Sequence, residues 1–122
     1  MALIVVIDDD PDIREASTLV LTAKGHNVIT AGTPEEGYDL ILNKKPDLII
    51  LDVMMNEPDD GFFLAQRLRK ENIKTPIIMY TSVSKTMGMD FDKGDIVPVD
   101  DFVEKPISPD SLIEKVNKLL NK

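Results

Sequence analysis

Acidic residues follow two of the most apolar stretches of this chain. Asp8, Asp9 and Asp10 come directly after a short aliphatic run, and Asp52 follows residues 48–51, which are all aliphatic. A charged group at the end of a buried strand is costly unless another group pairs with it. Carboxylates that lie close together also repel one another, and a cation relieves the repulsion. The sequence therefore indicates a cation site formed by Asp8, Asp9 and Asp52.

A site made of carboxylates, in a chain without cysteine, suits a hard cation. Mg²⁺ is favoured over Ca²⁺, because two or three carboxylates leave room for the water or phosphate oxygens that complete an octahedron. A hydroxyl and an ammonium group also follow apolar runs, at Thr81 and Lys105. Such a set suits phosphoryl transfer, in which the Asp52 carboxylate can act as the nucleophile.

Aliphatic strands alternate with amphipathic helices along the chain. Strands are predicted over residues 3–7, 28–31, 48–51, 77–80 and 102–104. Asp10 is the expected N-cap of the first helix, and Thr33 opens the second with a capping box. The alternation predicts an α/β fold with a parallel sheet covered on both faces. Because such sheets bind ligands at the carboxyl ends of their strands, the polar residues named above are expected at one edge.

Helical spacing also predicts which side chains are buried. The buried stripe of the first helix is expected at Ile13, Ala16, Val20 and Ala23. The helix over about residues 61–71 is expected to bury Phe62, Ala65 and Leu68, with Phe63 and Leu64 as further candidates.

Glycine and proline interrupt residues 84–99, so a fourth helix there is expected to be short or irregular. His26, beside a helix-ending glycine, is expected to be exposed and without a role.

Composition narrows the class of protein. The 122 residues predict one domain over residues 1–122, and the formal net charge of −8 argues against direct binding of nucleic acid or an anionic membrane. The absence of cysteine excludes a disulfide framework and a thiolate metal site. The first apolar run is too short for a signal peptide or a membrane span, so a cytoplasmic location is expected.

The ordered set of polar residues resembles the receiver domain of two-component response regulators. An acidic pair, Asp8 and Asp9, follows the first strand, and Asp52, Thr81 and Lys105 follow the third, fourth and fifth strands. The resemblance covers essentially the whole chain. It implies a doubly wound, flavodoxin-like sandwich of strand order 2-1-3-4-5.

The resemblance also implies a phosphoacceptor and a metal site. Asp52 is the implied phosphoacceptor, and its implied donor is a histidine kinase, a phosphotransfer protein or a small phosphodonor. Mg²⁺ is implied to bind Asp9, Asp52 and the backbone carbonyl of Met54, while Asp8 acts largely through water. The implied catalysis is confined to the protein's own phosphoryl uptake and autodephosphorylation, so it is not expected to be an enzyme acting on other substrates.

A conformational switch is implied by the remaining matches. Lys105 and Thr81 are implied to contact the phosphoryl group, and Phe102 matches the aromatic residue that changes position with it. Phosphorylation is therefore expected to alter the face formed by helix four, strand five and helix five. The downstream protein partner stays open, and a monomer or weak homodimer is expected. No effector domain follows the last helix in this sequence, and both a stand-alone receiver and a trimmed one stay possible.

The loop after Asp52 departs from the family pattern. The proline and glycine expected there come later, at Pro58 and Gly61, which indicates one inserted residue near Asn56 and a reshaped loop. The segment between Thr81 and Lys105 is also longer than usual.

Three other functions remain as alternatives. A phosphohydrolase of the haloacid-dehalogenase type needs a second Asp where Met54 stands. An interaction module that no longer depends on phosphorylation would fit the irregular loops. A flavodoxin-like binder would need a phosphate-binding loop of Gly, Ser and Thr after the first strand, and that loop is acidic.

Overall fold

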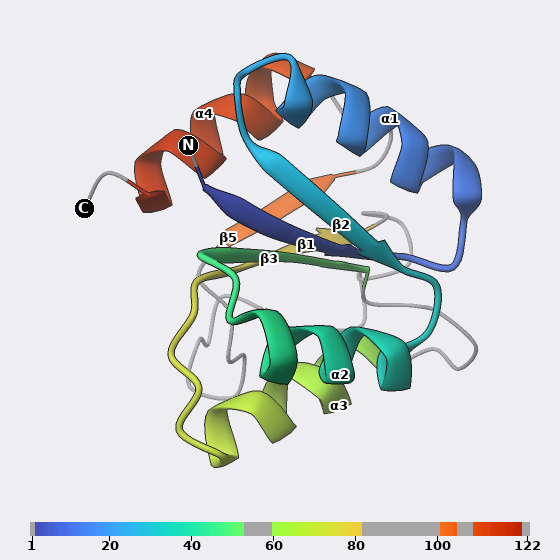
Figure 1. Cartoon of the computed structure of the whole chain (residues 1–122), viewed down its shortest axis with the longest axis vertical. Helices are drawn as coiled ribbons and strands as arrows, with labels where there is room; N and C mark the ends of the chain where they lie inside the picture. The colour runs from blue at the N-terminus through green and yellow to red at the C-terminus, as the bar shows by residue number, and fades with distance from the viewer. Residues whose placement is uncertain (1, 53–59, 82–100, 105–108, 121–122) are drawn as a thin grey trace.

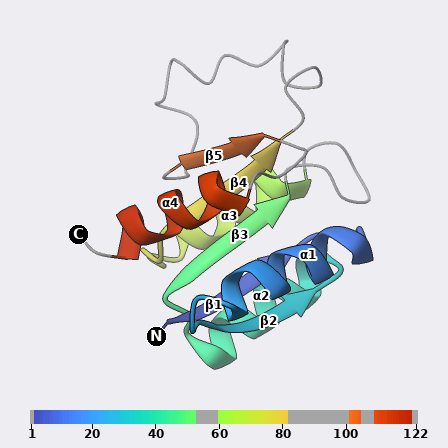
Figure 2. The same ribbon diagram turned by 90° about the horizontal axis from the view of Figure 1, so that it is seen from above.

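Five short strands form a single parallel sheet between layers of helices (Figures 1 and 2). The structure is a computed structural model that describes residues 2–52, 60–81, 101–104 and 109–120. The strands are β1 (Leu3–Ile7), β2 (Asn27–Ala31), β3 (Leu48–Asp52), β4 (Ile77–Thr81) and β5 (Asp101–Glu104). They lie in the order β2-β1-β3-β4-β5, which confirms the doubly wound topology predicted from the sequence.

Helices cover both faces of this sheet. They are α1 (Pro11–Thr22), α2 (Pro34–Lys44), α3 (Asp60–Lys70) and α4 (Pro109–Leu120). Helices α1 and α4 lie on one face and α2 and α3 on the other (Figure 1). Helix α4 is the last helix predicted from the sequence, whereas the irregular helix expected over residues 84–99 lies outside the described residues. Within the described ranges, no helix has the length and apolar character needed to cross a membrane.

The central strand is buried on both faces. Ile49 and Leu51 of β3 pack in the cluster that α2 and α3 complete, whereas Leu48 and Ile50 pack in the cluster on the α1 and α4 side. All four side chains are 0% exposed. A strand that is covered twice needs apolar side chains at every position, and this explains the unbroken aliphatic run before Asp52.

Side-chain caps begin α1 and α2 where the sequence predicted them. The Asp10 carboxylate accepts a hydrogen bond from the Asp12 N–H at 2.9 Å, and the Thr33 hydroxyl accepts one from the Glu36 N–H at 3.1 Å. The Glu36 carboxylate reaches back to the Gly32 N–H at 2.9 Å. These bonds satisfy N–H groups that have no partner within the helix. They also fix the turns by which the chain leaves β1 and β2.

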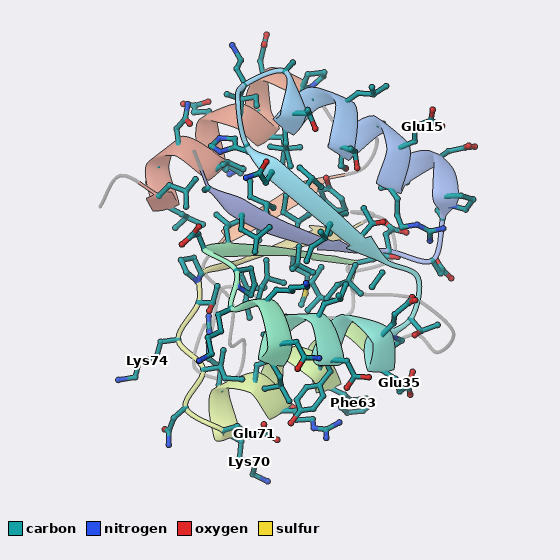
Figure 3. All side chains as sticks on the ribbon, viewed as in Figure 1. Glu15, Glu35, Phe63, Lys70, Glu71 and Lys74 are labelled. Carbon is teal, nitrogen blue, oxygen red and sulfur yellow. The ribbon has the colours of Figure 1, made fainter. Side chains whose placement is uncertain are left out.

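The buried face of α3 differs from the prediction at one position. Leu64, Ala65 and Leu68 are buried as expected, but Phe63 is 62% exposed and lies on the outer side of the α2 and α3 layer (Figure 3). Phe63 is two residues from Ala65, which places it roughly 200° around the helix from a buried position. The side chain of Phe62 lies outside the described residues.

The buried stripe of α1 was predicted correctly only in part: Ile13 and Val20 are half-buried and pack against the cluster on this face of the sheet. Ser17 and Leu21 are 1% and 0% exposed, whereas Ala16 and Ala23 lie on the exposed side. Ser17 follows Ile13 by four residues and precedes Leu21 by four, so helical spacing places it in the stripe. Only the polarity of Ser17 argued against its burial, and its hydroxyl group is satisfied by a hydrogen bond with the Tyr80 hydroxyl.

His26 contacts the start of β1, contrary to the expectation that it has no role. Its Nδ1 atom accepts a hydrogen bond from the Ala2 N–H at 3.3 Å, and partial burial together with the nearby amino terminus lowers its pKa from the ordinary value of 6.5. The folded state therefore binds fewer protons at His26 than the unfolded state does. Its contribution to stability is present above pH 6.5 and is lost as the pH falls through the folded-state pKa.

We expect His26→Asn to reduce the loss of stability between pH 7.5 and pH 5.5, a window of about one unit on either side of the unfolded pKa. Urea unfolding of both proteins at each pH measures the difference. Parallel stability curves for the variant and the wild type would contradict this account of His26.

Candidate metal centre

Strands β1 and β3 bring two carboxylates to one edge of the sheet. The strands are parallel neighbours in which Ile7 lies opposite Leu51, so Asp8 and Asp52 are the next residues on both strands. Asp9 follows in the turn between β1 and α1. The convergence at the carboxyl edge thus follows from strand register, because parallel strands end together.

The three carboxylates form a compact cluster. Asp8, Asp9 and Asp52 each offer an oxygen, and these oxygens all lie within 4.8 Å of one another. Asp8 and Asp52 are 0% and 3% exposed, whereas Asp9 is exposed. Oxygen donors at this spacing fit a hard divalent cation, and one exposed member leaves an approach from solvent. The residues present therefore fit Mg²⁺, and their role as its ligands stays a prediction.

Three hydrogen bonds, one of them between backbone groups alone, hold the turn that carries Asp8 and Asp9. The Asp8 N–H donates to the Ala31 carbonyl of β2 at 3.0 Å, and the Asp8 Oδ1 atom accepts from the Asp10 N–H at 2.9 Å. The Asp8 carbonyl accepts a hydrogen bond of 2.6 Å from Nη1 of Arg14 in α1. Arg14 is not among the site residues predicted from the sequence, and only its position one helical turn beyond the acidic residues could have suggested the contact.

A buried pair of hydroxyl groups lies on the α1 side of the cluster. The Tyr80 hydroxyl in β4 and the Ser17 hydroxyl in α1 are 2.7 Å apart, and both residues are buried. Burial raises the pKa of Tyr80 well above its ordinary value, the hydrogen bond with Ser17 offsets part of this rise, and the charges of Asp8 and Asp52 raise the pKa further. The Tyr80 phenol is therefore a neutral hydroxyl group that is sensitive to the charge of the acidic cluster.

Loss of both hydroxyl groups should destabilise the fold by less than the sum of the two single losses. We expect Tyr80→Phe and Ser17→Ala each to cost about 1–2 kcal/mol, because each removes the hydrogen bond between two buried hydroxyl groups. The double variant should cost clearly less than the sum, which urea unfolding of the four proteins measures as a coupling free energy. Tyr38→Phe is the control, because its hydroxyl bonds Glu71 at the exposed surface and should cost less. Additive effects of the two buried changes would contradict the pairing.

Several other predicted site residues are described only in part or not at all. Thr81 is the last residue of β4 and lies opposite Glu104 of β5, and Phe102 lies within β5, but their side chains lie outside the described residues. Met54, Lys105 and the loop around Asn56 lie outside them entirely. The backbone register places Tyr80 opposite Asp52, so Thr81 comes one residue further along the neighbouring strand.

The sequence of this chain is similar to those of known proteins. A family model described as the response regulator receiver domain matches residues 4–117. The probable transcriptional regulator ycf27 of Porphyra purpurea is 38% identical over 98% of this chain and 47% of its own length. The transcriptional regulatory protein PhoP of Bacillus subtilis, named for alkaline phosphatase synthesis, is 35% identical over 98% of this chain and 48% of its own length. The chain thus spans about half the length of these curated relatives.

Solved structures share the same architecture. The receiver domain of the Francisella response regulator 1452 has a TM-score of 0.87 and 32% identity, with 99% of this chain and 98% of that chain covered. A CheY-like response regulator receiver domain protein from Methanospirillum hungatei has a TM-score of 0.82 and 25% identity, with 99% and 94% covered. In both comparisons the structural similarity covers nearly the full length of the two chains compared.

Proposed function

The chain belongs to the response regulator receiver domain family, and we propose that it is a switch that accepts a phosphoryl group at Asp52. The observation that carries this proposal is the position of Asp52. Its nearly buried carboxylate ends the central strand and lies within 4.8 Å of the carboxylate oxygens of Asp8 and Asp9. A carboxylate nucleophile beside a cation site is the arrangement that aspartyl phosphate formation requires.

The chemistry assigns a separate role to each member of the cluster. An Asp52 oxygen forms the new bond to phosphorus while the bond between phosphorus and the donor breaks. Asp9, Asp52 and the backbone carbonyl of Met54 would hold Mg²⁺, and Asp8 would act on it through water. Bound Mg²⁺ would offset negative charge on the phosphoryl oxygens during transfer. Burial of Asp8 and Asp52 strengthens these interactions, because water screens charge less in a buried site.

The proposed response starts from strands β4 and β5. Thr81 ends the strand beside β3, and Lys105 follows the last residue of β5, so both come next to the strand ends in sequence. A phosphoryl group adds charge and strong acceptor oxygens that a hydroxyl and an ammonium group can bind. Movement of Thr81 toward it would leave space for Phe102. A change from nearly off to nearly on requires roughly 5.5 kcal/mol of differential stabilisation, which a few charge-assisted hydrogen bonds can supply.

The proposed partners follow from this role. A histidine kinase or a phosphotransfer protein would supply the phosphoryl group. The relatives are named as transcriptional regulators and are about twice as long as this chain, so in a longer protein the phosphorylated receiver would act on further segments. The receiver itself, with a net charge of −8, would contact protein rather than nucleic acid.

The proposal is tested by intact-mass spectrometry after incubation with acetyl phosphate, with and without Mg²⁺. We expect the mass to increase by one phosphoryl group in the presence of Mg²⁺ and to stay unchanged in its absence. A folded protein that gains no mass under either condition would argue for an interaction module that does not depend on phosphorylation.

A further inference from the structure

Arg14 holds the peptide group that joins Asp8 to Asp9. Its Nη1 atom donates to the Asp8 carbonyl at 2.6 Å, and that carbonyl belongs to the peptide from which Asp9 continues. We propose that Arg14 is a positioning residue that sets the direction of the Asp9 carboxylate for a divalent cation. This inference rests on the proposed function, because it concerns the same cation site.

The orientation of the Asp9 carboxylate is set by the backbone on either side of it. Within the described residues its exposed carboxylate makes no hydrogen bond, in contrast to the Asp8 carboxylate, which accepts from the Asp10 N–H at 2.9 Å. The peptide before Asp9 is held by Arg14, and the amide of Asp10 after it is held by Asp8. Mutation of a group that orients a metal ligand through a hydrogen bond typically lowers metal affinity by roughly 10- to 100-fold.

The surroundings of Arg14 keep its guanidinium group at this carbonyl. A Cβ atom on Gly32 would lie only 3.1 Å from Nη1, so the glycine leaves the space that the guanidinium occupies. Among the described residues Arg14 forms no ion pair with an acidic side chain. Its position in the first turns of α1 therefore ties the helix to the acidic turn through a charge-assisted hydrogen bond, a comparatively strong kind.

Charge and position predict opposite effects when Arg14 is replaced. A cation near three carboxylates repels Mg²⁺, so charge alone predicts that removal of the guanidinium strengthens Mg²⁺ binding. Loss of the hydrogen bond leaves the Asp8–Asp9 peptide free to move, so the positioning role predicts weaker Mg²⁺ binding. The sign of the change in Mg²⁺ affinity therefore separates the two roles.

The experiment is a Mg²⁺ titration of the unphosphorylated chain, followed by the amide signals of residues 8–10 in ¹H–¹⁵N NMR spectra. We expect Arg14→Met to weaken Mg²⁺ binding about 10-fold. Arg14→Lys should recover part of the loss, because an ammonium group can still donate to the carbonyl. If Arg14→Met does not fold, as judged by circular dichroism, Arg14→Lys decides alone, with an expected several-fold loss at unchanged charge.

Arg69→Met is the matched control. Arg69 also donates from Nη1 to backbone carbonyls, those of Ile73 at 2.8 Å and Thr75 at 2.9 Å. These carbonyls precede β4 and so lie at the opposite edge of the sheet from the acidic cluster. The control removes the same charge from the protein, and we expect it to leave Mg²⁺ affinity unchanged.

Three results would overturn the inference: equal or tighter Mg²⁺ binding by Arg14→Met, binding by Arg14→Lys as weak as that of Arg14→Met, or equal losses in Arg14→Met and Arg69→Met. Failure of the wild type to bind Mg²⁺ would instead contradict the proposed function. The two failures are thus distinguishable in the same titration.

Discussion

Asp52→Asn is expected to abolish phosphoryl uptake from acetyl phosphate while the chain stays folded. The amide has no anionic oxygen with which to attack phosphorus, so no acyl phosphate can form at this position. Asn has nearly the same shape as Asp, and the change replaces one of three clustered carboxylates by a neutral group. Intact-mass spectrometry with Mg²⁺ measures the loss, and circular dichroism establishes that the fold is kept.

Asp10→Asn is the control for this change. Asp10 lies beside the cluster but serves as the N-cap of α1 through its bond to the Asp12 N–H. Asn caps helices about as well as Asp, so stability should change little. We expect this variant to take up a phosphoryl group as the wild type does. A phosphoryl adduct that persists on Asp52→Asn would refute the assignment of Asp52 as the acceptor.

Mg²⁺ should also stabilise the wild type more than it stabilises Asp52→Asn. A ligand that binds only the folded state adds about 2.7 kcal/mol when its concentration is 100 times its dissociation constant. The variant lacks one anionic ligand, so its gain at the same Mg²⁺ concentration should be smaller. Thermal unfolding at several Mg²⁺ concentrations measures both gains and needs no phosphodonor.

The sequence was sufficient to predict the sheet and the convergence of the acidic residues. Strands β1 and β3 are continuous aliphatic runs up to the acidic residues, and this pattern fits a parallel sheet covered on both faces. Once the strands are parallel, residues that directly follow them must meet at one edge, as Asp8 and Asp52 do beyond the paired Ile7 and Leu51. The prediction needed only the type of sheet and the place where each strand ends.

The contacts that support the cluster could not be predicted in the same way. Ser17 and Tyr80 are 63 residues apart, and a serine in an apolar helical stripe gives no sign that its partner is a tyrosine on another element. The Arg14 contact depends on the path of the turn that joins β1 to α1. Helical spacing correctly predicted that Ala65 and Leu68 are buried. Because residues 62–65 are all apolar, the spacing alone did not decide whether Phe63 faces the sheet or the solvent.

The packing role of Gly37 was also not predicted from the sequence, although a glycine inside a helix costs about 1 kcal/mol relative to alanine and so calls for a reason. The structure supplies one. Gly37 is buried in α2, where a Cβ atom would overlap Cδ1 of Ile7 and lie 2.7 Å from its Cγ1 atom. Ile7 is the last residue of β1 and is 0% exposed, so the helix packs directly against the strand that leads into Asp8.

Gly37→Val is therefore expected to destabilise the fold by about 3 kcal/mol, because three added carbon atoms overpack a closed interface and the small gain in helix propensity does not offset this. Ile7→Ala removes three carbon atoms from the same interface and alone should cost about 2–5 kcal/mol. Together the two changes conserve volume, so Ile7→Ala should become stabilising in the Gly37→Val background. Urea unfolding of the four proteins measures this reversal of sign.

Asn43→Val provides the control for valine in α2. Asn43 is exposed on the same helix, and Asn and Val have similar helix propensities, so the change should cost less than about 0.5 kcal/mol. A comparable loss at Gly37 and Asn43 would mean that valine harms the helix itself and not its packing on β1. If Ile7→Ala lowered stability equally in both backgrounds, the contact between Gly37 and Ile7 would not control how closely α2 approaches the strand that carries the acidic turn.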